Sequence, residues 1–222
     1  LHWHIQAGTG PDDLIPTLNY DSDHTAPRSQ SGYASIIQSK DGASAMLIDW
    51  NSKKQTLPTC SSGTSELVAC HYSVVSAGPL LVDVGNLSLG RNSKGKPRFI
   101  LRGDNLIPLR IANRGWSRVC GELKLRHRTY NLKASLLRDI KAKAVMGTEH
   151  VWSYVNASDM FTKVLNKTMH NNACALCGVG IHHRSVKFAF SQGRLELGLG
   201  LPLRTQDLDF SSGQINEGIF GD

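Results

Sequence analysis

The sequence lacks the glycine-rich patterns that bind nucleotide phosphates, and it contains no grouping of Ser, His and Asp, or of Cys and His, that indicates a nucleophilic enzyme. No apolar run approaches the roughly 20 residues that cross a bilayer. Residues 1–10 also lack the basic and apolar regions of a signal peptide. Internal repeats are absent. These absences favour an intracellular protein, cytoplasmic or nuclear, with no membrane partner.

Basic residues outnumber acidic ones, and the cysteines lack the spacing of a disulfide framework. The chain has 25 Lys and Arg against 18 Asp and Glu, a net charge of +7, which favours polyanions such as nucleic acid or a membrane surface. Five cysteines, an odd number without regular spacing, fit a reducing compartment. Because the sequence begins at Leu1 rather than Met, two origins stay open: a fragment of a longer polyprotein and a partial gene model.

Turn signals and periodicity predict one main domain with a segment at each end. We expect a leader at 1–13, a domain at 14–170 and a C-terminal extension, partly disordered, at 171–222. Alternating apolar runs predict strands, and a 3.6-residue period predicts helices. The expected strands are 14–21, 33–38, 45–50, 98–104 and 150–155. The expected helices are 61–78, which Gly78-Pro79 should end or kink, then 105–113, 124–143 and 158–169, with a polar loop at 86–97.

This order of elements predicts an α/β fold. Its centre is a mixed five-stranded sheet, the first three strands antiparallel, flanked by helices. The turn signal Asp41-Gly42 joins the second and third strands as a hairpin. In the helix at 124–143, Leu132, Leu136 and Ile140 have the spacing of an apolar helix face.

Four carboxylates stand in the expected central elements. Asp21 closes the first strand and Asp104 the fourth. Glu66 lies in the first helix, and Asp159 opens the last one. Such positions can meet at one sheet edge, where acids repel one another unless cations separate them. Two divalent ions about 4 Å apart recur in phosphodiester hydrolysis, and oxygen ligands favour Mg²⁺ or Mn²⁺ over zinc. Two alternatives stay open: each Asp is a cap or turn former, and Glu66 lies on a solvated helix face.

Short sequence blocks recur in a known order and spacing. The chain contains Ser31-Gly32-Tyr33 and Ser52-Lys53-Lys54-Gln55, followed by "SSGTSELVA", "GDN" and "SDMFTK". These blocks resemble the ribonuclease H domain of copia-type retrotransposon polyproteins, where they read S-G-Y, S-K-K-Q, S-S-T-E-A-E-Y-M-A, C-D-N and A-D-x-x-T-K. The resemblance covers 15–168, about seven tenths of the chain. It implies a ribonuclease H-like fold, with the leader as the remnant of a connection to an upstream polymerase.

The resemblance also implies a site and an activity. The catalytic and metal-binding residues would be Asp21, Glu66, Asp104 and Asp159, holding two Mg²⁺ or Mn²⁺ ions. The implied protein is a metal-dependent endoribonuclease that cleaves the RNA strand of RNA–DNA hybrids, with the hybrid and a reverse transcriptase domain of the parent polyprotein as partners. The chain departs from the family at Thr129, often a His, at His24, usually a Trp, and in a shorter stretch before Asp159. The alternative is a catalytically inactive, domesticated module of the same fold that binds nucleic acid or is structural.

Basic residues gather in the expected helix at 124–143, which carries seven Lys or Arg against one Asp. A solvated helix face is one interpretation. The excess of one sign favours contact with phosphates. The residues expected to bind nucleic acid are Lys124, Arg126, Arg128, Lys133, Arg138 and Lys141.

Other features are assigned structural roles. Cys174-x-x-Cys177, with His170, His182 and His183 nearby, resembles a zinc knuckle. Lys187 stands at the position of the fourth ligand and cannot bind zinc, so we expect two buried or free thiols. Tyr33 and Trp50 are interpreted as core residues rather than as surfaces for base stacking.

Overall fold

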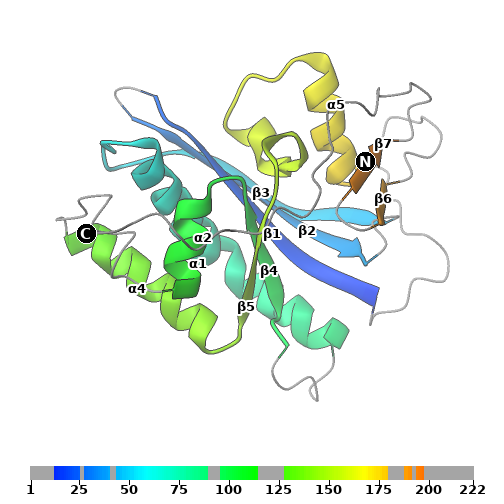
Figure 1. The fold of residues 1–222 in the computed structure, drawn as a ribbon, viewed down its shortest axis with the longest axis horizontal. Coiled ribbons are helices and arrows are strands. Elements are labelled where there is room, and N and C mark those ends of the chain that lie inside the picture. Colours follow the sequence, from blue (N-terminus) through cyan, green and yellow to red (C-terminus); the bar gives the residue numbers. More distant parts are fainter. Residues whose placement is uncertain are drawn as a thin grey trace, which may run out of the picture.

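The computed structural model describes residues 13–25, 28–40, 44–89, 96–114, 128–179, 188–191 and 194–197. Its centre is a five-stranded sheet in the order β3-β2-β1-β4-β5 (Figure 1). The strands are β1 (Leu14–Asp23), β2 (Gln30–Ser39), β3 (Ala45–Lys54), β4 (Phe99–Gly103) and β5 (Met146–His150). β2 is antiparallel to β1 and β3, whereas β4 is parallel to β1 and β5. The expected fold class is confirmed.

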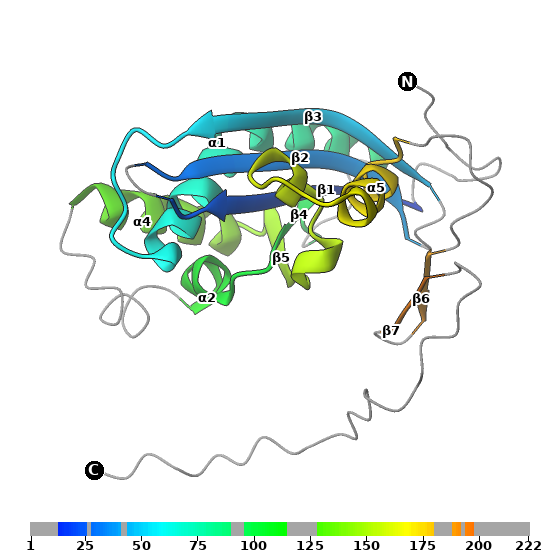
Figure 2. The same cartoon turned by 90° about the horizontal axis from the view of Figure 1, so that it is seen from above.

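Helices cover both faces of this sheet (Figure 2). On one face lie α1 (Ser62–Leu89), α2 (Leu106–Arg114) and α4 (Arg128–Ala142). After β5 come the 3-10 helices η2 (Ser153–Val155) and η3 (Ala157–Phe161), then α5 (Lys167–Leu176). η3 and the end of α5 pack on the opposite face. A separate hairpin is formed by β6 (Phe188–Ser191) and β7 (Arg194–Leu197).

The larger core lies between the sheet and α1. Leu18 and Tyr20 of β1 are completely buried in it, because alternate strand residues face the same side. Leu67, Val74 and Leu81 recur every seven residues on α1 and are buried against the same face. Each such side chain stabilises the fold by roughly 1.5–3 kcal/mol relative to exposure. The core therefore holds the start of α1 against the end of β1.

A smaller core lies on the other face. Ala34 and Ile36 of β2 and Leu47 of β3 pack against Ala157 of η3 and Cys177 after α5. The backbone N–H of Leu47 donates to the carbonyl of Cys177 at 2.9 Å. The chain that follows β5 is thus held on β2 and β3.

Two elements predicted near the end of the domain are wrong. The strand expected at 150–155 is β5, four residues earlier, where Met146 and Gly147 are buried beside β4. The aromatic run that suggested a strand forms an exposed segment and η2. The helix expected at 158–169 is divided into η3 and α5. A new helix, α5, starts at Lys167 because the Asn166 side chain accepts a hydrogen bond from the N–H of Met169 at 2.9 Å and caps it.

α1 does not end at Gly78-Pro79. Pro79 removes one helical hydrogen bond, but the helix continues through it, and Leu81 beyond it is fully buried in the core. The helix continues to Leu89, so the first four residues of the loop expected at 86–97 are helical.

The expectation that no segment is long and apolar enough to cross a bilayer is wrong for α1. Ser62–Leu87 passes that test by length and composition alone, with half of its most apolar window buried inside the fold. Its buried face packs on the sheet, which is the arrangement of a core helix.

α4 is a helix as predicted, but of its expected apolar face only Ile140 packs against the core. Leu132 and Leu136 are exposed, whereas Tyr130, Ala134 and Leu137 are buried against α1 and α2. The small side chain of Ala134 allows close packing of neighbouring helices, and an apolar spacing pattern does not reveal such contacts.

Candidate active site

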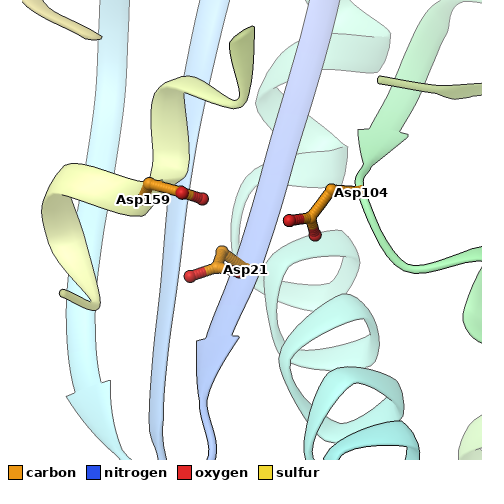
Figure 3. A group of neighbouring side chains, drawn as sticks. All are labelled: Asp21, Asp104 and Asp159. Atoms are coloured by element: carbon orange, nitrogen blue, oxygen red, sulfur yellow. The ribbon is translucent and has the colours of Figure 1, made fainter. Parts of the chain in front are cut away.

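The parallel pairing of β1 and β4 brings two of the predicted acids together. Asn19 pairs with Arg102 across these strands. Asp21 and Asp104 each follow two residues later, at the carboxyl ends of neighbouring parallel strands. Figure 3 shows these two side chains and that of Asp159 gathered at the end of β1. The sheet topology therefore creates an acidic edge.

A glycine on β2 allows η3 to reach that edge. Gly32 pairs with Asp21 on one side and with Ser52 of β3 on the other. A Cβ at residue 32 would lie 2.7 Å from Thr162 Cγ2 and 2.9 Å from Phe161 Cβ. Only glycine lets the end of η3 rest directly on β2, so this residue of the Ser-Gly-Tyr block positions Asp159.

β3 holds the same end of η3. The Ser52 hydroxyl donates to the Phe161 carbonyl, and the Trp50 indole stacks on the Phe161 ring with centroids 5.4 Å apart and planes 7° from parallel. Trp50 is 57% exposed, so its assignment to the core is wrong, whereas Tyr33 is buried as predicted. The Ser-Lys-Lys-Gln block thus contributes an anchor for the acidic site.

Three of the four predicted acids form one cluster. Ligand oxygens of Asp21, Asp104 and Asp159 lie within 4.8 Å of one another. Asp21 and Asp159 are buried, and Asp104 is half-buried. The cap of η3 is Asn156, whose side chain accepts from the Ser158 N–H, so Asp159 is not a cap.

Glu66 lies next to this cluster rather than within it. Its carboxylate is buried and accepts a hydrogen bond from the Ser22 N–H at 3.4 Å. The alternative of a solvated helix face is therefore wrong. Burial, followed by the charges of Asp21 and Asp104, raises the pKa of Glu66 well above its usual value. All four carboxylates thus share one electrostatic environment.

Sequence reasoning missed two functional residues, Thr162 and Lys163. The Lys163 ammonium lies 3.2 Å from an oxygen of Asp21 and 3.3 Å from an oxygen of Asp159. The Thr162 hydroxyl donates to the other oxygen of Asp21. Both residues stand in the SDMFTK block, and Lys163 follows Asp159 by four residues, a spacing that brings side chains together on a helical turn. These were the available signals.

Burial is the largest influence on the pKa values of Asp21, Asp159 and Lys163. Burial raises the pKa of Asp21, while the Lys163 charge and the Thr162 hydrogen bond oppose this change. Burial and the Asp21 charge raise the pKa of Asp159 to about 7. Burial opposes the charge of Lys163, yet the two carboxylates raise its pKa above the usual value. Near neutral pH the site thus holds a protonated amine beside Asp159, which is only partly ionised.

The side chains fit a hard divalent cation. One oxygen each of Glu66 and Asp159 is buried and has no hydrogen-bond partner among the described residues. Such orphaned oxygens are costly unless a cation or a proton satisfies them. The clustered donors are all carboxylate oxygens, the ligands that Mg²⁺, Mn²⁺ or Ca²⁺ prefer.

Neighbouring groups orient Asp104. The Ser153 hydroxyl donates to its carboxylate at 2.5 Å, and the His150 ring nitrogen lies 3.0 Å from its carbonyl. Tyr20 donates to the carbonyl of Asn105 at 3.4 Å. This tyrosine fits because residue 103 is glycine, where a Cβ would lie 2.4 Å from the ring.

The basic residues of α4 are only partly described. Lys124 and Arg126 lie outside the described residues, and Arg128 begins α4. Lys133 lies 3.2 Å from the His71 ring; burial lowers the pKa of Lys133, and burial together with the Lys133 charge lowers that of His71 to about 4. Arg138 pairs with the exposed Asp139 at 3.5 Å, and Lys141 is half-buried. Contact of this helix with nucleic acid stays a prediction.

The cysteine pair is split between two environments. Cys177 is buried in the smaller core, where burial raises its pKa to about 12. Cys174 is half-buried, and its sulfur lies 3.7 Å from His170. His182, His183 and Lys187 lie outside the described residues.

Comparison with known proteins was made at three levels. No family model matches this sequence, and no curated protein matches it. Similar solved structures include RNase H1 from the halophilic archaeon Halobacterium salinarum NRC-1, with 13% identity, 67% of this chain and 94% of that chain covered, and a TM-score of 0.42. The N-terminal RNase H domain of a Mycobacterium tuberculosis protein has 10% identity, coverages of 73% and 96%, and a TM-score of 0.44. LC11-RNase H1 in complex with an RNA/DNA hybrid has 14% identity, coverages of 67% and 93%, and a TM-score of 0.41. The assignment of the site therefore depends on the geometry of this chain.

Gly32→Ala is expected to destabilise the protein by about 1–3 kcal/mol, because the new methyl group must displace Thr162 and Phe161. Gly78→Ala is the control, since its Cβ would meet Val74 at an ordinary 3.7 Å, and it should stabilise α1 by up to about 1 kcal/mol because alanine is the better helix former. Urea unfolding measures both changes. Equal effects would contradict the seating of η3 on β2.

Proposed function

We propose that this chain is a metal-dependent endoribonuclease that cleaves the RNA strand of RNA–DNA hybrids and derives from a copia-type retrotransposon. The observation that carries the proposal is the convergence of Asp21, Asp104 and Asp159, from three separate elements, within 4.8 Å. A basic chain gains nothing in solubility from acids that meet in a partly buried site. Their arrangement is suited to holding cations against a phosphodiester.

Each residue has a distinct task in this proposal. Asp21, Asp104 and Asp159, with Glu66 beside them, hold two Mg²⁺ or Mn²⁺ ions. Such ions, when bound, lower the pKa of a water and stabilise charge on phosphodiester oxygens. Thr162 and Ser153 orient the carboxylates of Asp21 and Asp104. Asp159, with a pKa raised to about 7, takes up a proton as the pH falls below neutrality.

One observation favours a second candidate function. Lys163 already forms ion pairs with Asp21 and Asp159, so the acids are compatible with a folded protein that holds no metal. A catalytically inactive module that binds nucleic acid would need no more than this. The two candidates differ in whether a divalent ion displaces the ammonium group.

A cleavage assay tests the proposal. Purified protein is incubated with RNA–DNA hybrid, double-stranded RNA and double-stranded DNA, each end-labelled, in Mg²⁺ and in EDTA. We expect cleavage of the RNA strand of the hybrid, and only in Mg²⁺. Binding of the hybrid without cleavage in Mg²⁺ or Mn²⁺ would favour the inactive module, and cleavage in EDTA would contradict both.

Magnesium should protect the fold more strongly at high pH. The raised carboxyl pKa of Asp159 stabilises the metal-free protein fully below its unfolded value of about 3.9, and this stabilisation is lost as the pH rises through about 7. Mg²⁺ binds ionised carboxylates and so acts in the opposite direction. With Mg²⁺ tenfold above its Kd, we expect Tm to rise by about 3–5 °C at roughly pH 8.5 and by much less at roughly pH 5.5. Scanning fluorimetry at matched ionic strength measures this, and protection independent of pH would contradict it.

A further inference from the structure

Two exposed aromatic side chains flank a residue that binds the acidic site. Trp152 is 64% exposed and Tyr154 53% exposed. Between them, Ser153 donates its hydroxyl hydrogen bond to the Asp104 carboxylate at 2.5 Å. The two rings therefore project from the chain within one residue of a group that contacts the site.

The segment that carries the rings is tied down on both sides. The Val151 N–H donates to the Gly103 carbonyl at 3.1 Å, and the Asn156 side chain donates to the Tyr20 carbonyl at 3.1 Å. The His150 ring meets the Trp152 ring edge-on, with centroids 5.8 Å apart and an interplanar angle of 74°. These hydrogen bonds hold the backbone that carries Trp152 and Tyr154, while both side chains stay exposed.

Exposed single apolar residues are ordinary, but this pair differs from the others in this fold. Trp50, the other exposed tryptophan among the described residues, is covered on one side by Phe161. Leu87 is also exposed, but it is aliphatic and lies on α1. Only the 152–154 segment, among the described residues, places exposed Trp and Tyr side chains on either side of a residue that hydrogen-bonds a cluster acid. Flat aromatic faces stack on nucleobases, and the net charge of +7 draws a polyanion to the surface.

We propose that Trp152 and Tyr154 form a platform that stacks unpaired nucleobases of the substrate on the Asp104 side of the acids. This inference rests on the proposed function, which supplies nucleic acid as the ligand. Bases within a duplex already stack on their neighbours, so a protein ring reaches them only in unpaired nucleotides. The chain accordingly prefers a hybrid that continues into a single strand beside the site over a blunt hybrid.

Binding in EDTA tests the platform without any cleavage. Fluorescence anisotropy compares a blunt hybrid, a hybrid with a short single-stranded extension, and the same extension built from abasic nucleotides. The base-bearing extension should tighten binding about tenfold, and the abasic one should not. Trp152→Ala should remove the gain while leaving the slope of log affinity against log salt unchanged, because stacking releases no counterions. Tyr154→Ala should reduce the gain in part.

Leu87→Ala is the matched control, since it also removes an exposed apolar side chain, 83% exposed on α1, and it should keep the full gain. An equal gain from the abasic extension, or a full gain in Trp152→Ala, would overturn the platform. Loss of blunt-hybrid binding in Trp152→Ala would overturn it too, since the residue would then have a general structural role. An extension effect in EDTA with no cleavage in Mg²⁺ would refute the nuclease alone, and cleavage with no extension effect would refute the platform alone.

Discussion

Asp104→Asn is expected to lower the rate of RNA-strand cleavage by more than about 100-fold while leaving hybrid binding and folding nearly unchanged. Even residues that merely support a metal ligand change metal affinity or activity by about 10- to 100-fold, and a ligand itself should matter more. Asparagine keeps the shape of the side chain and an oxygen that can accept the Ser153 hydrogen bond. It removes one negative charge from the cluster of three acids. Single-turnover cleavage and anisotropy, measured on the same preparation, separate the two effects.

Asp139→Asn is the matched control, because Asp139 is an exposed acid on α4 whose partner is Arg138 at 3.5 Å. It should leave cleavage unchanged, as expected of a surface ion pair that contributes little. If Asp104→Asn instead lowers stability and leaves cleavage intact, the acid has a structural role. Asp104 would then not be a catalytic metal ligand, and cleavage would depend on the other acids.

The meeting of Asp21 and Asp104 could be predicted because it depends on the order and direction of the strands. Asp21 and Asp104 follow two buried apolar runs, and parallel neighbours end at the same edge of a sheet. Short apolar runs and the turn signal between two of them also identified β1, β2 and β3, whose structure extends the expected ranges by a few residues. The spacing of apolar residues predicts single strands and helices, and their order along the chain predicts the type of sheet.

The surroundings of the acids could not be read in this way because they depend on contacts between distant elements. The run at 150–155 is rich in residues that favour strands, but β4 pairs with the residues before it. Leu132 and Leu136 have helical spacing, yet α4 packs through Ala134. The blocks around Gly32 and Ser52 could be recognised as motifs in the sequence. Their reason, the close approach of Phe161 and Thr162 to β2 and β3, appears only in three dimensions.

The position of Lys163 changes what the metal-free site is expected to do. Three acids alone would repel one another and weaken the fold until a cation binds. Lys163 supplies a positive charge to two of them, so the metal-free protein is stabilised by its own side chain. A divalent ion must then compete with this ammonium for the same oxygens.

Lys163→Met is therefore expected to lower the stability of the metal-free protein and to raise its affinity for Mg²⁺. Removing one partner of a buried ion pair costs about 3–5 kcal/mol, and we expect about 3 kcal/mol because the Lys163 side chain is 35% exposed. The loss should be greatest at high pH, where Asp159 is ionised, and should shrink as the pH falls below about 7. Urea unfolding with and without Mg²⁺ measures the loss and its recovery.

Lys167→Met is the control, since Lys167 is an exposed lysine at the start of α5 and should change neither stability nor magnesium affinity. The competition model requires Mg²⁺ to restore more stability to Lys163→Met than to the parent protein, because the competing charge is gone. If the variant is destabilised but Mg²⁺ restores nothing at any pH, the carboxylates need a cation that only Lys163 supplies. The acidic cluster would then be a closed structural ion pair, and the inactive module would be the better description of this chain.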